Sequence, residues 1–240
     1  LPKLPVWMLR SDSPLVFRPR ADWQMIKWGA SFLRNCTQFR ADINTVNMLR
    51  LGLYSRECLN AIKEAEGLEF NHSKKGILHI YGTQEDLEHG KKQVEFQEKF
   101  GGEEKILSRE EVLALEPALA NSTQTIIGGI HAHHDESGDA HSFCTELAKK
   151  AEKYGVKFHY GVSVNALKKQ GNRIVAVNTD LGDMQADGFV MALGSYSPIY
   201  LRQVGIALPI YPMKGYSITI EANAYCPHVS LTDGTHKIVY

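Results

Sequence analysis

Apolar residues recur at intervals of three and four in the first third of the chain, which is the pattern of amphipathic helices. Between residues 20 and 66 they predict two helices separated by a break over residues 36–41. Trp23, Leu33, Leu49 and Leu53 belong to this pattern and share the apolar face of their helices. We therefore expect these four side chains to be buried.

The next part of the chain combines short strands with capped helices. Residues 76–81 are apolar and β-branched and predict a strand. Thr83 is expected to cap the helix that follows, because acidic residues occupy its first turn. Ser108 and Glu111 have the spacing of a capping box and predict a short helix ending at Pro117.

Strands predominate after residue 125. Asp139 is expected to cap a helix that stops at Gly155, and residues 170–172 have the composition of a hairpin turn. A helix, a glycine and a short strand in succession are typical of half of a βαβ unit. Strands are predicted at residues 125–133, 156–160, 163–167, 173–178, 184–193, 216–221 and 238–240. The pattern as a whole indicates a mixed α/β fold.

Composition narrows the function only by exclusion. The 240 residues include 27 basic and 27 acidic side chains, so net charge gives no reason to expect a nucleic-acid partner. Four scattered cysteines without a C-x-x-C motif predict neither a disulfide framework nor a cysteine zinc site, and reduced thiols favour a cytoplasmic location. No apolar run is long enough to cross a bilayer.

Three common catalytic and binding motifs are missing from the sequence. It contains neither Gly-x-Gly-x-x-Gly nor a P-loop, so the pyrophosphate loop of any dinucleotide site would lie outside these residues. The sequence around Ser195 lacks the Gly-x-Ser-x-Gly elbow, which argues against a serine hydrolase.

A histidine cluster is the most metal-like feature of the sequence. His131 and His133 would share one face of a strand, and His134 and Asp135 follow directly. A zinc site needs three or four ligands, and no third and fourth ligand occur at a matching spacing. We therefore predict no bound metal and a solvated strand end.

Aromatic and basic residues alternate near the start of the chain. Trp7, Trp23 and Trp28 lie close to Arg10, Arg18, Arg20 and Lys27 in the sequence. Packing in a helical core is the favoured interpretation, and a helix that lies on a membrane surface is the alternative.

The segment from Ala192 to Pro198 combines a strand end, a glycine, a small residue and a proline-started helix. Such a segment allows the close backbone approach that a bound nucleotide requires. A simple turn at Gly194 would produce the same sequence pattern, so both interpretations remain open.

Several segments of the chain follow the pattern of one known family. The two most specific are Val190–Ser197 (VMALGSYS) and Tyr211–Ser217 (YPMKGYS). The others are residues 28–36, 53–58, 116–119, 128–129, 135–139 and 155–158. Together these segments resemble bacterial D-amino-acid dehydrogenases, and the resemblance covers nearly the whole chain.

The resemblance implies an FAD enzyme that oxidises a free D-amino acid to a 2-oxo acid and ammonia. Its electrons would pass to a quinone or another carrier, with peripheral contact to the inner face of the cell membrane. By position, Val164, Ala192 and Gly194 align with residues that contact the adenine side of FAD, and Lys214 and Tyr216 are substrate-side candidates. No catalytic residue is assigned within the chain.

The resemblance also implies a fold and a domain division. The fold would be an incomplete Rossmann-like FAD domain (135–203) interleaved with a substrate domain of antiparallel sheet and helices (1–134 and 204–240). The glycine-rich loop and a carboxylate-binding arginine would lie beyond the two ends, so we expect a truncated central fragment, inactive alone. A glycine- or sarcosine-oxidase-like amine oxidase and a non-catalytic remnant are the alternatives.

Overall fold

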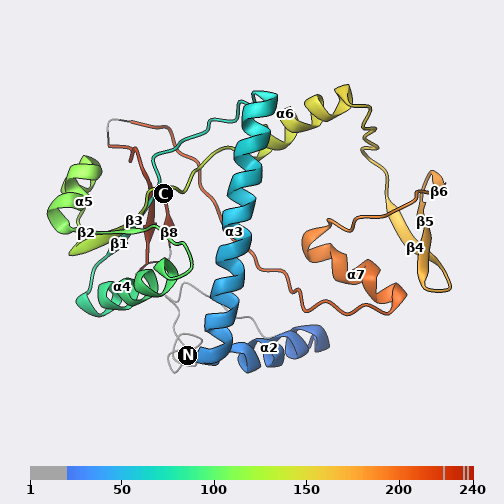
Figure 1. The fold of residues 1–240 in the computed structure, drawn as a ribbon, viewed down its shortest axis with the longest axis horizontal. Coiled ribbons are helices and arrows are strands. Elements are labelled where there is room, and N and C mark those ends of the chain that lie inside the picture. Colours follow the sequence, from blue (N-terminus) through green and yellow to red (C-terminus); the bar gives the residue numbers. More distant parts are fainter. Residues whose placement is uncertain (1–20, 224, 235, 237) are drawn as a thin grey trace. The chain divides into compact units, whose positions relative to one another are not determined.

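The computed structural model describes residues 21–223, 225–234, 236 and 238–240 (Figure 1). These residues form two compact units. The first contains residues 38–155 and 219–240, and the second contains residues 21–37 and 156–218. The chain passes between the units at 37/38, 155/156 and 218/219, whereas the sequence placed domain boundaries at 134/135 and 203/204.

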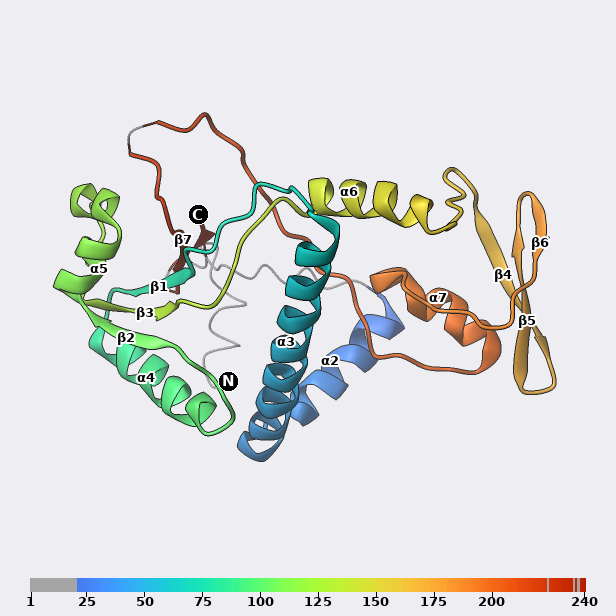
Figure 2. The same cartoon turned by 45° about the horizontal axis from the view of Figure 1, so that its top comes forward.

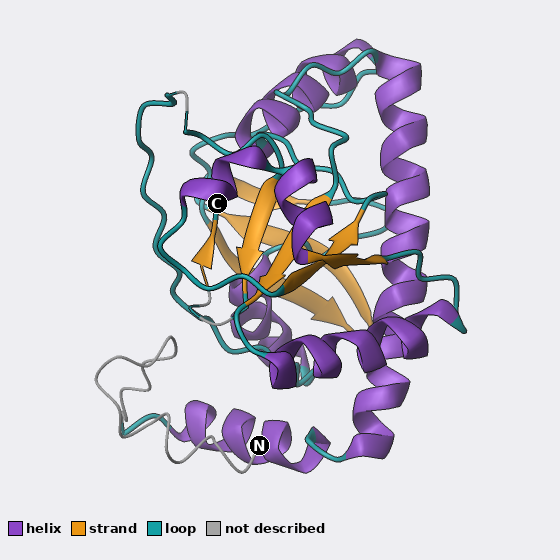
Figure 3. Ribbon diagram, turned by 90° about the vertical axis from the view of Figure 1, so that its left-hand side faces the viewer, coloured by secondary structure: helices purple, strands orange, loops and turns teal. Residues whose placement is uncertain are grey.

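A five-stranded mixed sheet forms the centre of the first unit (Figure 3). The strand order is β2-β3-β1-β7-β8, with β1 and β7 parallel and every other pair antiparallel. The strands are β1 (Ile77–Tyr81), β2 (Lys105–Ser108), β3 (Gly128–Ala132), β7 (Ser230–Asp233) and β8 (Ile238–Val239).

Helices α4 (Gln84–Glu98) and α5 (Arg109–Leu115) cover opposite faces of this sheet. The α5 face holds Leu78 and Val112, which are fully buried and pack with further apolar residues of β1 and β7. On the other face, Gly90 of α4 lies so close to Tyr81 and Ile130 that a methyl group would not fit. The alternating burial of β1 is the pattern of a strand covered unequally on its two faces.

The long helix α3 (Gln38–Glu66) has no buried residue, although it spans 29 residues. Leu49 and Leu53 are half-buried, while Trp23 and Leu33 of α2 (Trp23–Asn35) are 66% and 57% exposed. The prediction that these four side chains are buried is therefore wrong. Helical spacing identified apolar faces, but the described residues do not cover them.

The second unit is built on a smaller antiparallel sheet of order β4-β5-β6 (Figure 2). Gly171, in the left-handed region at φ +58°, forms the predicted hairpin turn. The elements are β4 (Val164–Gln170), β5 (Arg173–Thr179), β6 (Gly182–Met184), α2, α7 (Ser197–Leu201), and the 3₁₀ turns η2 (Gly194–Tyr196) and η3 (Arg202–Val204).

The predicted helix starts are confirmed by their hydrogen bonds. The Thr83 hydroxyl accepts from the backbone N–H of Asp86, and Ser108 and Glu111 form the complete capping box. Asp139 caps α6 (Ala140–Lys153), which is followed by Gly155 at φ +85°. The 3₁₀ turn η1 (Pro117–Asn121) begins at the predicted proline.

Three predicted strands are wrong, and two strands, β2 and β7, were missed. Residues 156–160 and 216–221 are irregular, and only the first residue of the run 184–193 lies in a strand. These runs have strand-like composition, but in the described residues no neighbouring strand pairs with them, and a strand needs a partner for its backbone groups. β7 was missed because four residues ending in Asp233 give a weak pattern.

No helix among the described residues is both long and apolar enough to cross a membrane.

Candidate functional site

All five residues predicted to face the cofactor or the substrate belong to the second unit. Val164 begins β4, and its carbonyl oxygen accepts a hydrogen bond of 2.9 Å from the Tyr200 hydroxyl of α7. The side-chain oxygen of Gln203 accepts a further hydrogen bond from the backbone N–H of Leu167 at 3.2 Å. The segment after Gly194 is thus tied to the strand that begins with Val164.

Ala192 and Gly194 are exposed and lie just before α7. Gly194 has φ +51°, a left-handed conformation that residues with a Cβ atom rarely adopt. A Cβ atom added to Gly194 would meet no atom within 4 Å. The glycine is therefore required by its backbone conformation, and the space beside it is open.

Lys214 and Tyr216 lie in an irregular stretch that runs over residues 206–223. Tyr216 is 94% exposed. Their predicted position on one face of a strand is wrong, because this stretch pairs with no other strand in the described part of the chain. The structure ties Val164 to Tyr200 of α7, the helix that follows Gly194, but it joins neither Val164 nor Gly194 to Lys214 or Tyr216 by a hydrogen bond among the described residues.

Two of the segments that carried the family resemblance have structural roles. Glu116 is fully buried, and its carboxylate accepts hydrogen bonds from the backbone N–H groups of Ala118, His228 and Val229. It therefore connects the end of α5 to the chain that enters β7. Sequence reasoning missed this role, because nothing in the local pattern indicates a contact across more than one hundred residues.

The segment 135–139 fastens the chain after β3 to the chain before β1. Ser137 and Ser73 exchange two backbone hydrogen bonds, and Gly138 lies against the ring of Phe70. Glu136 accepts hydrogen bonds of 2.5 Å from Lys63 of α3 and from His72. Burial raises the pKa of Glu136, but the hydrogen bonds and charges of Lys63 and His72 outweigh burial and leave this pKa below its ordinary value.

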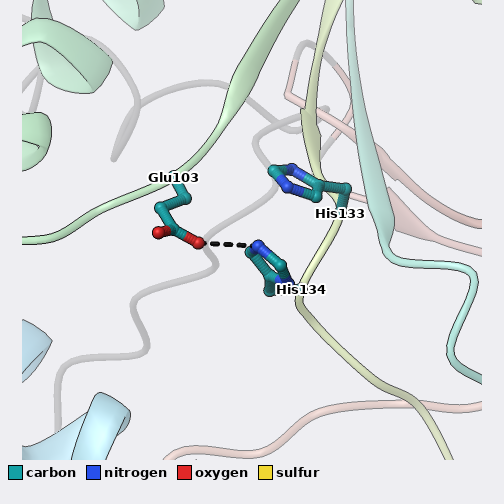
Figure 4. A group of neighbouring side chains, drawn as sticks. All are labelled: Glu103, His133 and His134. Carbon is teal, nitrogen blue, oxygen red and sulfur yellow. Dashed lines mark ion pairs between the residues drawn. The ribbon is translucent and has the colours of Figure 1, made fainter.

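The histidine cluster differs from its predicted geometry (Figure 4). His131 is hydrogen-bonded to the backbone carbonyl of Lys75 at 2.9 Å, whereas His133 and His134 lie beside Glu103. The ligand atoms of these last three residues are within 4.8 Å of one another. A third candidate ligand, Glu103, therefore comes from a neighbouring segment, which sequence spacing did not indicate.

The surroundings of His133 lower the pKa of its imidazole. Burial lowers the pKa of His133, and the nearby charges of His134, Lys105 and His131 act in the same direction. Glu104, the residue after Glu103, also has an unpartnered oxygen. One of its carboxylate oxygens is buried and has no hydrogen-bond partner among the described residues. Burial raises the pKa of Glu104.

Comparison with known families gives one match that covers most of the chain. Residues 21–240 match the family described as "DAO: FAD dependent oxidoreductase".

The curated relatives that match this chain are longer than it. The D-amino acid dehydrogenase of Paramagnetospirillum magneticum is 40% identical over 243 aligned residues, covering all of this chain and 58% of the relative. That of Agrobacterium fabrum is 40% identical, covering 97% of this chain and 56% of the relative. The chain thus spans a little more than half the length of the curated relatives it matches.

Solved structures show the same fold at lower identity. L-proline dehydrogenase from P. horikoshii aligns with a TM-score of 0.56 and 24% identity, over 64% of this chain and 40% of that one. Glycine oxidase from Geobacillus kaustophilus aligns with a TM-score of 0.58 and 21% identity, over 66% of this chain and 43% of that one. At these identities the similarity concerns the fold alone.

Proposed function

Because the chain belongs to the DAO family of FAD-dependent oxidoreductases, we propose that it is part of an enzyme that oxidises D-amino acids. The products are the 2-oxo acid and ammonia. The observation that carries this proposal is the 40% identity, over the whole chain, to a D-amino acid dehydrogenase. Electrons leave the enzyme for a quinone or another carrier.

The second unit has features that suit the adenine side of FAD. Gly194 has a left-handed backbone and open space beside it, so a ligand can approach the main chain closely there. Val164 is held in place through the Tyr200 hydroxyl. We assign Val164, Ala192 and Gly194 to cofactor binding, and residues 135–203 to the FAD domain.

The chain's own residues bind and orient, while the redox chemistry belongs to the cofactor. When bound, FAD supplies the acceptor for a hydride from the substrate α-carbon. The resulting imine of the substrate hydrolyses in water to the 2-oxo acid and ammonia. Residues 1–134 and 204–240 are assigned to the substrate domain, in which Lys214 and Tyr216 face the substrate.

The decisive experiment uses the protein expressed from the complete reading frame that contains this chain. We expect it to be yellow with bound flavin and to reduce an artificial dye with D-alanine but not with L-alanine. Oxidation of sarcosine or L-amino acids without oxidation of D-alanine would contradict the proposed substrate class. The assignment of FAD as the cofactor would still hold. A full protein that binds no flavin and oxidises no amine would support the non-catalytic remnant.

A pair of glycine variants tests the cofactor residues. Gly194→Val should lower the flavin content per protein, because the side chain strains the left-handed backbone and fills the open space. Gly171→Val is the matched control: it has a similar positive φ and open surroundings, but lies at the hairpin turn. Equal flavin loss in both variants would show that strain, and not the space beside Gly194, matters.

The substrate-side residues have a separate test. Tyr216→Phe should leave the flavin content unchanged and alter kcat or KM for D-alanine.

The 240 residues alone should hold flavin weakly and show no D-alanine oxidation, because they contain no glycine-rich pyrophosphate loop. Stoichiometric flavin on this chain by itself would contradict the prediction that flavin binding needs the glycine-rich loop.

Peripheral contact with the cytoplasmic face of the membrane belongs to the same proposal. α2 exposes Trp23, Ile26 and Phe32, and Lys27 lies 5.6 Å from the ring centre of Trp23. Exposed aromatic residues beside a basic residue favour a membrane interface. Trp7, Arg10, Arg18 and Arg20 lie outside the described residues. This contact can be tested by sedimentation with anionic vesicles. We expect the protein to sediment with the vesicles and Trp23→Ala to reduce the sedimented fraction.

A further inference from the structure

A tight turn after β3 places two neighbouring histidine rings together. The backbone N–H of Asp135 donates to the carbonyl of Ala132 at 3.0 Å, which closes the turn. In a continuous strand His133 and His134 would point to opposite faces. The turn removes this alternation, and the two ring centres lie 4.0 Å apart.

Glu103 reaches the same place through the pairing of β2 with β3. These strands are antiparallel, with Lys105 opposite His131. Two residues beyond that pair, the chain before β2 therefore brings Glu103 opposite His133. The Glu103 carboxylate lies 2.6 Å from Nε2 of His134, as the dashed line in Figure 4 shows.

His133 provides a second, independent observation. Its Nδ1 atom is buried and has no hydrogen-bond partner in the part of the chain that the structure describes. Buried polar atoms are nearly always satisfied, and an exception indicates a missing partner such as an ion. A metal ion bound at Nδ1 of His133 would give this nitrogen its partner.

We propose that Glu103, His133 and His134 bind a divalent transition-metal ion of the zinc type. Two imidazole nitrogens and one carboxylate oxygen form a common zinc ligand set, with water in the fourth position. Magnesium is a poor fit, because it requires near-octahedral oxygen ligands. The site lies in the first unit, and the proposal does not depend on flavin binding or on the proposed reaction.

Binding requires a small rearrangement of the ion pair. Two ligands of a tetrahedral zinc ion lie about 3.4 Å apart when each bond is about 2.1 Å. Glu103 and His134 must therefore separate by less than one ångström, which two exposed side chains can do. A protonated His134 loses its proton to water when its nitrogen takes the metal. The ion then links the start of β2 to the turn after β3.

The test is zinc binding by protein purified without a polyhistidine tag, measured by competition with a chromophoric chelator. We expect one zinc per chain at this site. Affinity should fall at least tenfold in His133→Ala, His134→Ala and Glu103→Gln, and magnesium should not compete. His89→Ala is the matched control, because His89 is exposed on α4 and lies outside the cluster; it should leave the affinity unchanged.

A cobalt(II) spectrum distinguishes this site from the four free cysteines. Ligation by histidine and carboxylate gives visible d–d bands without thiolate-to-cobalt charge transfer. Wild-type affinity in Glu103→Gln and His133→Ala, or a spectrum dominated by thiolate charge transfer, would overturn the proposal. Circular dichroism checks the fold of each variant, and Glu103→Gln decides the question should a histidine variant unfold.

Discussion

The sheet core and the long helix α3 lie in the same unit, but they are stabilised in different ways. Leu78 of β1 is fully buried and packs among apolar residues from α5 and β7. α3 also carries apolar residues, such as Leu49 and Leu51, yet none of its residues is buried. The contrast shows that an apolar face stabilises a structure only where another element covers it.

Polar contacts instead hold the C-terminal end of α3. Lys63 pairs with Glu136 at 2.5 Å, and the Tyr154 hydroxyl donates to Glu66 at 2.8 Å. Lys150 of α6 donates to the Glu66 backbone carbonyl. Ion pairs and hydrogen bonds contribute less than apolar burial and depend on pH. We therefore expect substitutions in the sheet and in α3 to differ in size and in pH response.

The largest effect is expected at the centre of the sheet. Leu78→Ala should lower the free energy of unfolding by about 2–5 kcal/mol, because it removes a buried side chain and leaves a cavity. Chemical denaturation measures this loss. Leu51→Ala on the exposed side of α3 is the control and should change stability by less than about 0.5 kcal/mol. Equal losses of unfolding free energy in the two variants would show that the sheet core and α3 are stabilised in the same way.

Glu116→Gln should be the next most destabilising change. The amide has one acceptor oxygen in place of two, so a buried backbone N–H of residue 118, 228 or 229 loses its partner. The expected cost is about 1–3 kcal/mol. Hydrogen exchange should rise at residues 228 and 229. Unchanged exchange there would show that the carboxylate does not hold the entry to β7.

Glu136→Gln should have a smaller effect that depends on pH. The folded-state pKa of Glu136 is lowered, so its stabilisation is present above the ordinary glutamate pKa of 4.5 and is lost as pH falls through the folded-state value. At pH 7 the variant should lose roughly 1 kcal/mol, and the difference from wild type should shrink below pH 4.5. Glu88→Gln, in an exposed pair with Lys91, is the control. A loss that is constant from pH 7 to pH 3 would exclude the ion pair as its cause.

Leu49→Ala should have the smallest effect. A core position on α3 would have given a loss of about 2–5 kcal/mol. Because Leu49 is only half-buried and alanine favours the helix, we expect less than about 1 kcal/mol from denaturation of the 240-residue chain. A loss above about 2 kcal/mol would mean that another element covers this face of α3.

The sequence predicted most of the local structure correctly, because those features depend on neighbouring residues. The caps at Thr83, Ser108 and Asp139 each involve a side chain and a backbone group two or three residues away. The hairpin at Gly171 depends on a single turn. The strands predicted at 156–160 and 216–221 failed, because strand formation needs a partner that composition does not reveal.

Candidate sites followed the same rule. The resemblance to the family and the glycine at residue 194 could be recognised directly, and the left-handed φ of Gly194 agrees with the need for a glycine there. Glu103 could not be predicted as a neighbour of His133 and His134, because about thirty residues separate them in the sequence. Only the register of β2 against β3 brings them together.

The sequence alone therefore determined the family, the mixed α/β class and the residues at which the capped helices begin, since each follows from local residue order. The tertiary structure decided which apolar faces are buried, what Glu116 and Glu136 hold in place, and which side chain joins the histidines. These depend on strand register and packing between distant segments, and their energies come from contacts that no short stretch of sequence contains.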